Sequence, residues 1–335
     1  MIVSIINLPL SCLTCYFATI FVIVILLFVF LLYVTTNDAI PIVNVFESEQ
    51  TFVDPKKKDL EEFPFNQQLG TVSISVIIPA YNEESRLPIM LDAALEYLSK
   101  RQNTDSLFSF EIIIVDDGSK DNTTQVALQY VNKYGSEKIR VLTLKKNRGK
   151  GGAVRLGVFS SRGSKILFAD ADGATKFSDL DIVEAGLDEL HGGKNNMAIS
   201  IGSRAHLQEE AIAERSLFRN ILMYGFHFLV YVLCVKGIKD TQCGFKLLTR
   251  KAALTLFSTL HVERWAFDVE LLYAAQYLGI PIAEKAVNWQ EIEGSKMVPI
   301  FSWLQMGKDL LLIRVRYVIG AWKIWTGPPN LVIMH

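Results

Sequence analysis

Two aspartates one residue apart, in Asp170-Ala171-Asp172-Gly173, carry the clearest chemical signal in this chain. They follow residues 165–169, an apolar run with the length and composition of a strand. Alternate carboxylates at a strand end can direct one group at a divalent cation and the other at a ribose or a second ligand, and Mg²⁺ and Mn²⁺ prefer such oxygen ligands. A solvated acidic turn is the alternative, so the elements that position the pair decide between the two interpretations.

The sequence around this pair repeats one order of elements, in which an apolar strand is followed by a polar loop and a helical pattern. We expect strands over residues 72–79, 110–115, 139–144 and 165–169. This order predicts an α/β fold with a Rossmann-like, doubly wound and mostly parallel sheet. Ligands bind such sheets at the carboxyl ends of the strands, where these polar loops lie.

The loops after the four strands therefore bring their polar residues to one crevice. The candidate residues are Pro79, Ala80, Tyr81, Asn82, Glu83, Asp116, Asp117, Lys150, Asp170, Ala171 and Asp172. The convergence favours a ligand site over a solvated acidic turn. The stretch 147–153 is not a P-loop, because Gly149-Lys150 is followed by Gly151, and no G-x-G-x-x-G follows the first strand. We expect Lys150, near a helix start on a flexible backbone, to approach a phosphate; a solvated lysine is the alternative.

The composition fits one folded domain with an appendage. The chain has 335 residues, of which 50% are hydrophobic, and can bury one sizeable core. Its formal net charge of −1 gives no support for a nucleic-acid partner. Cys12, Cys15, Cys234 and Cys243 have no disulfide-framework or zinc-site spacing, so we expect reduced thiols.

The N-terminal part divides into three segments before the folded domain. A tail, residues 1–9, precedes the apolar segment 10–34, which as a helix is long enough to cross a bilayer. We predict an uncleaved signal-anchor. A cleaved signal peptide is the alternative, but the run is too long for a usual h-region and lacks a basic n-region. The polar, proline-containing residues 35–69 are predicted to be a linker, and residues 70–290 the folded domain.

Two later segments have the composition of membrane-surface helices. Residues 217–235 are apolar around most of a helix, and we expect an interfacial helix with Tyr224, Phe226 and Tyr231 at headgroup depth. A buried core helix is the alternative. Residues 291–335 mix apolar runs with basic and tryptophan side chains, which predicts amphipathic surface helices and a tail. Those side chains are Lys308, Arg314, Arg316, Lys323, Trp303, Trp322 and Trp325.

Seven short motifs in the folded domain form one set. They are Pro79-Ala80-Tyr81-Asn82-Glu83, Asp116-Asp117-Gly118-Ser119, Asn147-Arg148-Gly149-Lys150-Gly151, Asp170-Ala171-Asp172, Gly202-Ser203-Arg204, Asp240-Thr241-Gln242-Cys243-Gly244-Phe245-Lys246 and Arg264-Trp265-Ala266-Phe267-Asp268-Val269-Glu270. This set resembles the motifs of the family-2 inverting glycosyltransferases of the GT-A fold, over about residues 72–290. The later motifs and the N-terminal anchor are most similar to members that move glucose from UDP-glucose to dolichyl phosphate on the cytosolic face of the endoplasmic reticulum.

The resemblance implies a role for each donor-site residue. Asp117, helped by Asp116, would read the uracil, and the backbone of residues 79–81 would line the nucleoside. Asp170 would reach the ribose, and Asp172 would hold Mg²⁺ or Mn²⁺ on the diphosphate. The resemblance also implies inversion at the anomeric carbon.

The acceptor determines which further residues are needed. A phosphate monoester is mostly dianionic at pH 7, since its second pKa is about 6, so it needs positioning cations more than a general base. Arg204, Lys246 and Arg264 are the candidates. Arg204 comes first because arginine can bind phosphate through two parallel hydrogen bonds. A surface ion pair with Glu209 or Glu210 is the alternative for Arg204.

Asp268 is expected to bind a sugar hydroxyl or to orient one of these cations.

The expected partners are UDP-glucose, dolichyl phosphate and membrane lipid, and nothing in the sequence indicates an oligomer. A mannosyl- or other-sugar transferase on the same lipid is the alternative enzyme, because motifs do not fix donor choice. A non-catalytic sugar-nucleotide or lipid-binding membrane scaffold is the alternative from another class.

Overall fold

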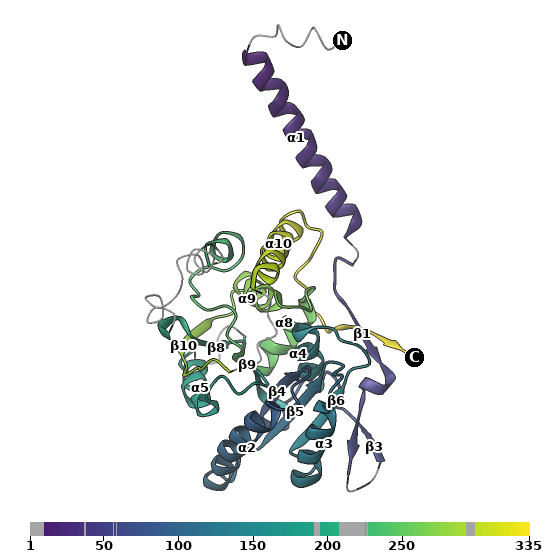
Figure 1. Cartoon of the computed structure of the whole chain (residues 1–335), viewed down its shortest axis with the longest axis vertical. Coiled ribbons are helices and arrows are strands. Elements are labelled where there is room, and N and C mark those ends of the chain that lie inside the picture. The colour runs from purple at the N-terminus through teal and green to yellow at the C-terminus, as the bar shows by residue number, and fades with distance from the viewer. Residues whose placement is uncertain are drawn as a thin grey trace.

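The computed structural model describes residues 10–36, 38–55, 57, 59–190, 195–207, 225, 227–292 and 299–335, and only the backbone of residues 10–13 and 299–304. Its centre is a seven-stranded sheet. The strands are β4 (Val72–Ala80), β5 (Phe110–Asp116), β6 (Ile139–Thr143), β7 (Gly163–Ala169), β8 (Ile199–Ser203), β9 (Phe245–Thr249) and β10 (Ile282–Ala286). Their order across the sheet is β10-β8-β9-β7-β4-β5-β6. Helices cover both faces (Figure 1).

Most strands of the sheet are parallel. Parallel pairing joins β4 to β5 and to β7, β5 to β6, and β8 to β10. Only β9, among these seven strands, runs antiparallel to its neighbours, β7 and β8. Every residue of β5 is buried, which explains its continuous apolar run, since helices cover both faces of a parallel sheet. The predicted doubly wound, mostly parallel sheet is confirmed, and the reversed β9 is an addition.

Two layers of helices pack against the sheet. Helices α2 (Leu87–Thr104), α3 (Thr123–Tyr134) and α5 (Leu180–Glu189) lie on one face. Helices α4 (Lys150–Phe159), α8 (Arg250–Thr259) and α9 (Phe267–Tyr277) lie on the other.

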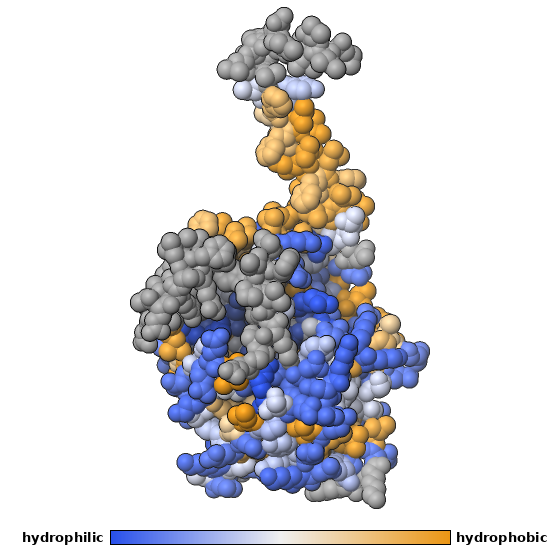
Figure 2. Space-filling view, viewed as in Figure 1, coloured by the Kyte–Doolittle hydropathy of each residue, from blue (hydrophilic) through white to orange (hydrophobic). Residues whose placement is uncertain are grey.

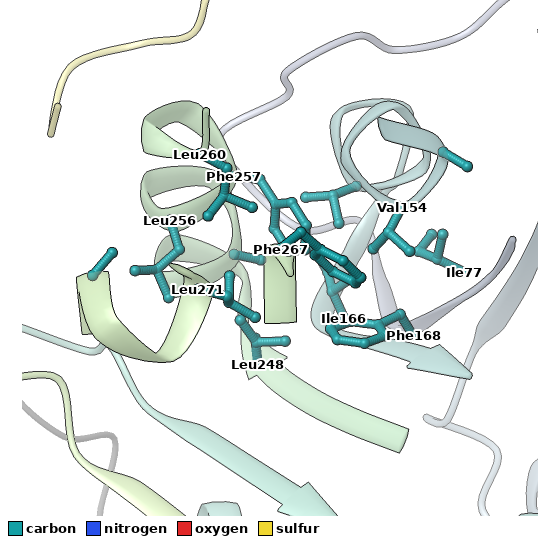
Figure 3. Close-up of a cluster of buried hydrophobic side chains, with 14 of the residues drawn as sticks. Ile77, Val154, Ile166, Phe168, Leu248, Leu256, Phe257, Leu260, Phe267 and Leu271 are labelled. Carbon is teal, nitrogen blue, oxygen red and sulfur yellow. The ribbon is translucent and has the colours of Figure 1, made fainter. Parts of the chain in front are cut away.

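Aromatic packing joins the second layer to the sheet. Phe168 of β7 lies against Phe257 of α8 and Phe267 of α9, with ring centroids 6.3 and 6.0 Å apart (Figure 3). Burying each such side chain contributes about 1.5–3 kcal/mol. The packing fixes the start of α9, which carries Asp268.

An apolar helix, α1 (Leu10–Thr35), extends away from the domain (Figure 1). Within the described part of the chain, Thr14–Thr35 is the one stretch long and apolar enough to cross a membrane, with a mean hydropathy of 3.1 and none of it buried. About 20 apolar residues suffice for a bilayer core of about 30 Å. Figure 2 shows α1 as almost wholly hydrophobic. The helix is consistent with the predicted transmembrane anchor.

The segment predicted to be a linker, residues 35–69, instead forms strands that pack on the domain. It contains β1 (Ile42–Phe46), the 3₁₀ turn η1 (Glu47–Glu49), β2 (Thr51–Asp54) and β3 (Asp59–Glu62). β1 pairs in parallel with β11 (Asn330–Met334), and its Val43 and Val45 are buried. The linker prediction was wrong. It gave the prolines and charged residues of this segment more weight than the short alternating run of residues 42–46, which is a strand pattern.

The C-terminal part also differs from the series of surface helices that we predicted. One helix, α10 (Pro299–Val318), is followed by turns and irregular chain that lead to β11. Trp322 is buried, and its ring stacks on that of His261 at 4.3 Å with an interplanar angle of 9°. Trp322 therefore belongs to the protein core rather than to a membrane surface, because an aromatic partner on the domain covers it.

About half of the predicted interfacial helix, residues 217–235, lies outside the described residues, as do Glu209, Glu210, Tyr224 and Phe226. Residues 227–233 are helical. In this helical segment Phe228, Leu229, Tyr231 and Val232 are exposed, and Val230 is buried. The described part thus exposes apolar side chains, as expected of an interfacial helix, and its contact with lipid stays a prediction.

A buried ionic cluster ties the N-terminal strands to the sheet. Glu111 of β5 is fully buried and pairs with Arg140 and with Arg162, whose Nε lies 3.0 Å from Glu111 Oε2. The Arg140 guanidinium lies 5.3 Å from the ring centre of Phe52 and 5.5 Å from that of Phe63. Burial lowers the pKa of Arg140 to about 9. The cluster thus depends on the Glu111 carboxylate.

We expect Glu111→Gln to lower the free energy of unfolding by about 3–5 kcal/mol, because Arg140 stays buried without its counter-charge. Denaturant unfolding of the detergent-solubilised chain measures this. Glu137→Gln is the matched control: it contacts Arg162 at 3.4 Å, but its side chain is 87% exposed, so we expect a change of about 0.5 kcal/mol or less. Equal stability of the two variants would contradict the role of the cluster.

Candidate active site

A cavity of about 520 Å³ opens at the carboxyl edge of the sheet. The predicted site residues that line it are Pro79, Ala80, Tyr81, Glu83, Asp117, Lys150, Asp170, Ala171, Asp172, Arg204, Arg264 and Asp268. The loops after β4, β5, β6 and β7 meet there because parallel strands end at one edge. The structure thus brings together residues from all four predicted loops.

Asp170 and Asp172 follow directly from the end of β7. An Asp170 carboxylate oxygen lies 2.5 Å from the ammonium of Lys150, the first residue of α4. Asp172 Oδ1 accepts the backbone N–H of Ala174 at 3.0 Å. A Cβ at position 244 would overlap the Asp170 carboxylate, so Gly244 allows the backbone before β9 to approach it.

The charges of this group depend on one another. Burial and then the neighbouring Asp170 raise the pKa of Asp172. Burial acts to lower the pKa of Lys150, but the carboxylates, Asp170 and Asp268 foremost, raise it overall. Lys150 is therefore protonated at neutral pH and offsets part of the acidic charge. The remaining negative charge favours a cation at the cavity.

These carboxylates fit a divalent metal whose other ligands come from a substrate. The described residues contain no cluster of three or more acidic, histidine or cysteine side chains that could hold a metal ion by themselves. Mg²⁺ commonly binds through one or two carboxylates together with substrate phosphates and water. Asp172, whose pKa is raised by burial and then by the neighbouring Asp170 carboxylate, fits that kind of incomplete site.

Asp117 is held by the loop between β6 and α4. Its two carboxylate oxygens accept backbone N–H groups from Arg148 at 2.7 Å and from Gly149 at 2.8 Å. Gly149 has φ +87°, a conformation that favours glycine. Burial raises the pKa of Asp117 to about 6 in spite of these donors. This carboxylate thus changes charge near neutral pH.

Asp116 and Asn82 do not line the cavity and instead shape its walls. Asp116 accepts the backbone N–H of Ser119 at 2.8 Å and the hydroxyl of Thr124. Asn82, in the left-handed region at φ 53°, accepts the backbone N–H of Lys120 at 2.8 Å. Both residues hold the loops that follow β4 and β5.

Arg204 lies at the end of β8 and lines the cavity. Its Nε and Nη2 donate to Asp240 at 2.7 and 3.0 Å, a two-point pairing. Burial opposes the charge, but the hydrogen bonds and charge of Asp240 raise the pKa of Arg204. The guanidinium also lies 5.5 Å from the ring centre of Trp289. Glu209 and Glu210 lie outside the described residues, and Asp240 is the acidic partner that the structure describes.

Lys246 and Asp268 form a buried ion pair, with Lys246 Nζ 2.6 Å from Asp268 Oδ1. The Lys246 side chain is 0% exposed and does not line the cavity, whereas Asp268 does. The Lys246 ammonium also donates to the carbonyl of Cys243 at 2.6 Å. The structure thus places Lys246 beneath Asp268, where it can orient that carboxylate. Arg264, by contrast, is exposed and lines the cavity.

Further side chains that were not predicted as site residues also line the cavity, among them Arg86, Gln242 and Trp289. Arg86 donates to both carboxylate oxygens of Glu83, at 2.7 and 2.6 Å. The three-residue spacing of this pair was the signal that could have found it. Trp289 bridges to Thr175, so its position depends on a contact between distant segments that spacing cannot reveal.

The family model described as Glycosyl transferase family 2 matches residues 75–253. The Homo sapiens protein named dolichyl-phosphate beta-glucosyltransferase is 62% identical over 290 residues, which cover 87% of this chain and 89% of that protein. The Saccharomyces cerevisiae protein of the same name is 44% identical over 261 residues, with coverage of 75% and 77%.

Solved structures resemble the chain in fold. Mannosyl-3-phosphoglycerate synthase from Rubrobacter xylanophilus aligns with a TM-score of 0.50 at 16% identity and covers 74% of each chain. Glucosyl-3-phosphoglycerate synthase from Mycobacterium tuberculosis, crystallised with Mg²⁺ and UDP, aligns with a TM-score of 0.50 at 17% identity, covering 76% of this chain and 81% of that one. These likenesses agree with the predicted GT-A fold.

The family resemblance predicted from the motifs is confirmed, as is its narrower match to the dolichyl-phosphate group. The family model spans residues 75–253 of 335, and the Homo sapiens and Saccharomyces cerevisiae relatives align over most of the chain. This chain is a glycosyltransferase and belongs to glycosyl transferase family 2.

Proposed function

We propose that this chain transfers glucose from UDP-glucose to dolichyl phosphate, giving dolichyl β-D-glucosyl phosphate for protein N-glycosylation. The observation that carries the proposal is the Asp170 and Asp172 pair beside Lys150, in a cavity that Arg204 and Arg264 also line. Such a site can hold a sugar nucleotide at the carboxylates and a second phosphate at the arginines. The names of the relatives support this choice of acceptor and sugar.

The donor is held by groups at the strand ends. Asp117 reads the uracil, Asp170 binds the ribose, and Lys150 adds positive charge beside the diphosphate. Asp172 would hold Mg²⁺ or Mn²⁺, which when bound neutralises the diphosphate and stabilises the charge that develops on the departing nucleotide. Asp116 and Asn82 keep the surrounding loops in place.

The acceptor phosphate requires cations rather than a base. We assign this task to Arg264 and Arg204, since both line the cavity. An acceptor oxygen attacks the anomeric carbon as the bond to the nucleotide breaks, and attack from the opposite side inverts the α-linked donor to a β-linked product. No proton need be removed from a dianionic phosphate. Asp268, held by Lys246, orients a sugar hydroxyl.

The membrane geometry suits a lipid acceptor. α10 lies at the end of the domain from which α1 extends (Figure 1). Exposed apolar side chains at Phe228, Leu229, Tyr231 and Val232 add a surface that favours the interface. We place the chain in the endoplasmic reticulum membrane as a single-pass protein with a cytosolic catalytic domain.

The purified chain is expected to transfer labelled glucose from UDP-glucose into an organic-extractable product when dolichyl phosphate and Mg²⁺ are present. Omitting the lipid phosphate should abolish the transfer, because it supplies the attacking oxygen. GDP-mannose in a parallel reaction is the donor control. Transfer from GDP-mannose alone would refute the uracil and glucose assignments, and UDP binding without transfer would refute the acceptor.

Asp172→Asn should lower transfer by about 10²-fold or more, since a carboxylate that holds the metal stabilises charge in the transition state. Unfolding curves check that the variant stays folded. Asp188→Asn is the control, because this aspartate is exposed and pairs only with Lys165 among the described residues. Near-wild-type transfer by Asp172→Asn at saturating Mg²⁺ would overturn the metal-ligand role.

UDP-glucose binding should weaken as the pH falls through about 6, by about tenfold between pH 7 and pH 5. The pKa of Asp117 is raised above its usual value, so protonation sets in near pH 6 and removes acceptors for Arg148 and Gly149. The doubly esterified diphosphate of UDP-glucose does not titrate in this range. Calorimetric titration measures the affinity, and Asp117→Asn should flatten the profile. An unchanged slope in that variant would assign the effect to another group.

A further inference from the structure

The loop of residues 144–149, between β6 and α4, forms one wall of the proposed donor site. Its backbone N–H groups at Arg148 and Gly149 hold the Asp117 carboxylate, and Asn147 donates from its side chain to the Asp117 carbonyl at 3.0 Å. The next residue, Lys150, pairs with Asp170. A shift of this loop would therefore move two donor-site contacts together.

The opposite side of the loop is held by residues 42–49, that is β1 and η1, which we call the strap. The Arg148 side chain points away from Asp117 into the strap, where its Nη2 lies 2.7 Å from Glu49 Oε2 and its Nη1 donates to the Asn44 carbonyl. Glu49 Oε1 also accepts the backbone N–H of Lys145 at 3.0 Å. Glu49 is 0% exposed, so the pair is shielded from water and from salt.

An aromatic side chain of the strap adds to this contact. The Phe46 ring lies 4.5 Å from the ammonium of Lys145 and 5.8 Å from the guanidinium of Arg148. The backbone N–H of Phe46 donates to Glu49 Oε2 at 3.0 Å and so orients the carboxylate. The strap thus presents one buried anion and one ring to a loop rich in cations.

The strap is itself fixed to the domain on its other edge. β1 pairs with β11 from Ile42–Asn330 to Phe46–Met334. Just before the strap, the carbonyl of Ala39 accepts the backbone N–H of Lys323 at 2.9 Å. Because both of its edges are held, the strap can serve as a rigid support for the loop.

We propose that the strap positions the donor site: Glu49 fixes Arg148, and Arg148 in turn keeps the two backbone donors on Asp117. Glu49 is a positioning residue, since it acts through Arg148 and does not line the cavity. The link to nucleotide affinity rests on the proposed UDP-sugar donor. The segment that joins α1 to the domain thus serves as part of the donor site's support.

Full-length, detergent-solubilised Glu49→Gln tests the proposal through hydrogen exchange of the loop, residues 144–149, and through the dissociation constant for UDP. We expect faster exchange in this loop, a UDP dissociation constant raised about tenfold, and a raised KM for the donor with the KM for lipid phosphate unchanged. Arg148→Lys is a second, milder variant, because lysine keeps the charge but cannot contact Asn44 and Glu49 through a fork.

Glu111→Gln is the matched control. It also removes a fully buried carboxylate that pairs with an arginine, but Glu111 lies near the start of β5, away from Asp117, which follows the end of that strand. It should lower stability and leave exchange in the loop and UDP affinity unchanged. Unchanged loop exchange in both Glu49→Gln and Arg148→Lys would overturn the proposal, as would faster exchange with unchanged UDP affinity. Wild-type protein that binds no UDP would refute the donor assignment instead, and loop exchange would still decide whether the strap holds the loop.

Discussion

The repulsion between Asp170 and Asp172 is the constraint that the site is built to accommodate. Burial raises the pKa of Asp172, and the neighbouring Asp170 carboxylate, one residue away at the same strand end, raises it further. The ammonium of Lys150 offsets part of this charge. Because residue 244 is glycine, the backbone before β9 can approach the Asp170 carboxylate closely. A positively charged ligand therefore lowers the electrostatic energy of the two neighbouring carboxylates. Without such a ligand, their mutual repulsion remains in the folded chain.

The sequence allowed the sheet and its loops to be predicted because those features depend on local pattern. A buried parallel strand shows as a short β-branched run, and its carboxyl end lies beside those of its neighbours whatever the rest of the chain does. Asp117, Lys150, Asp170 and Asp172 could be brought together on that argument alone. The family resemblance then supplied the chemistry that the spacing left open.

The direction of each side chain was not predictable in the same way. Lys246 and Arg204 are both cations in motifs, yet Lys246 is buried under Asp268 whereas Arg204 lines the cavity. Their places depend on β9 reversing direction between β7 and β8, a pairing between residues far apart in the chain. Trp289 was missed for the same reason, whereas the strap was missed although its strand pattern is local. What motif spacing fixes is the type of residue near the site, and long-range pairing determines which face it presents.

The pairing of β1 with β11 has a consequence for the order in which the protein forms. α1 and β1 leave the ribosome early, but β1 cannot complete its sheet until residues 330–334 have been made. The central sheet needs none of those residues and is free to form first, as domains commonly do during synthesis. α1 is therefore complete well before its connection to the domain is fixed by the pairing of β1 with β11.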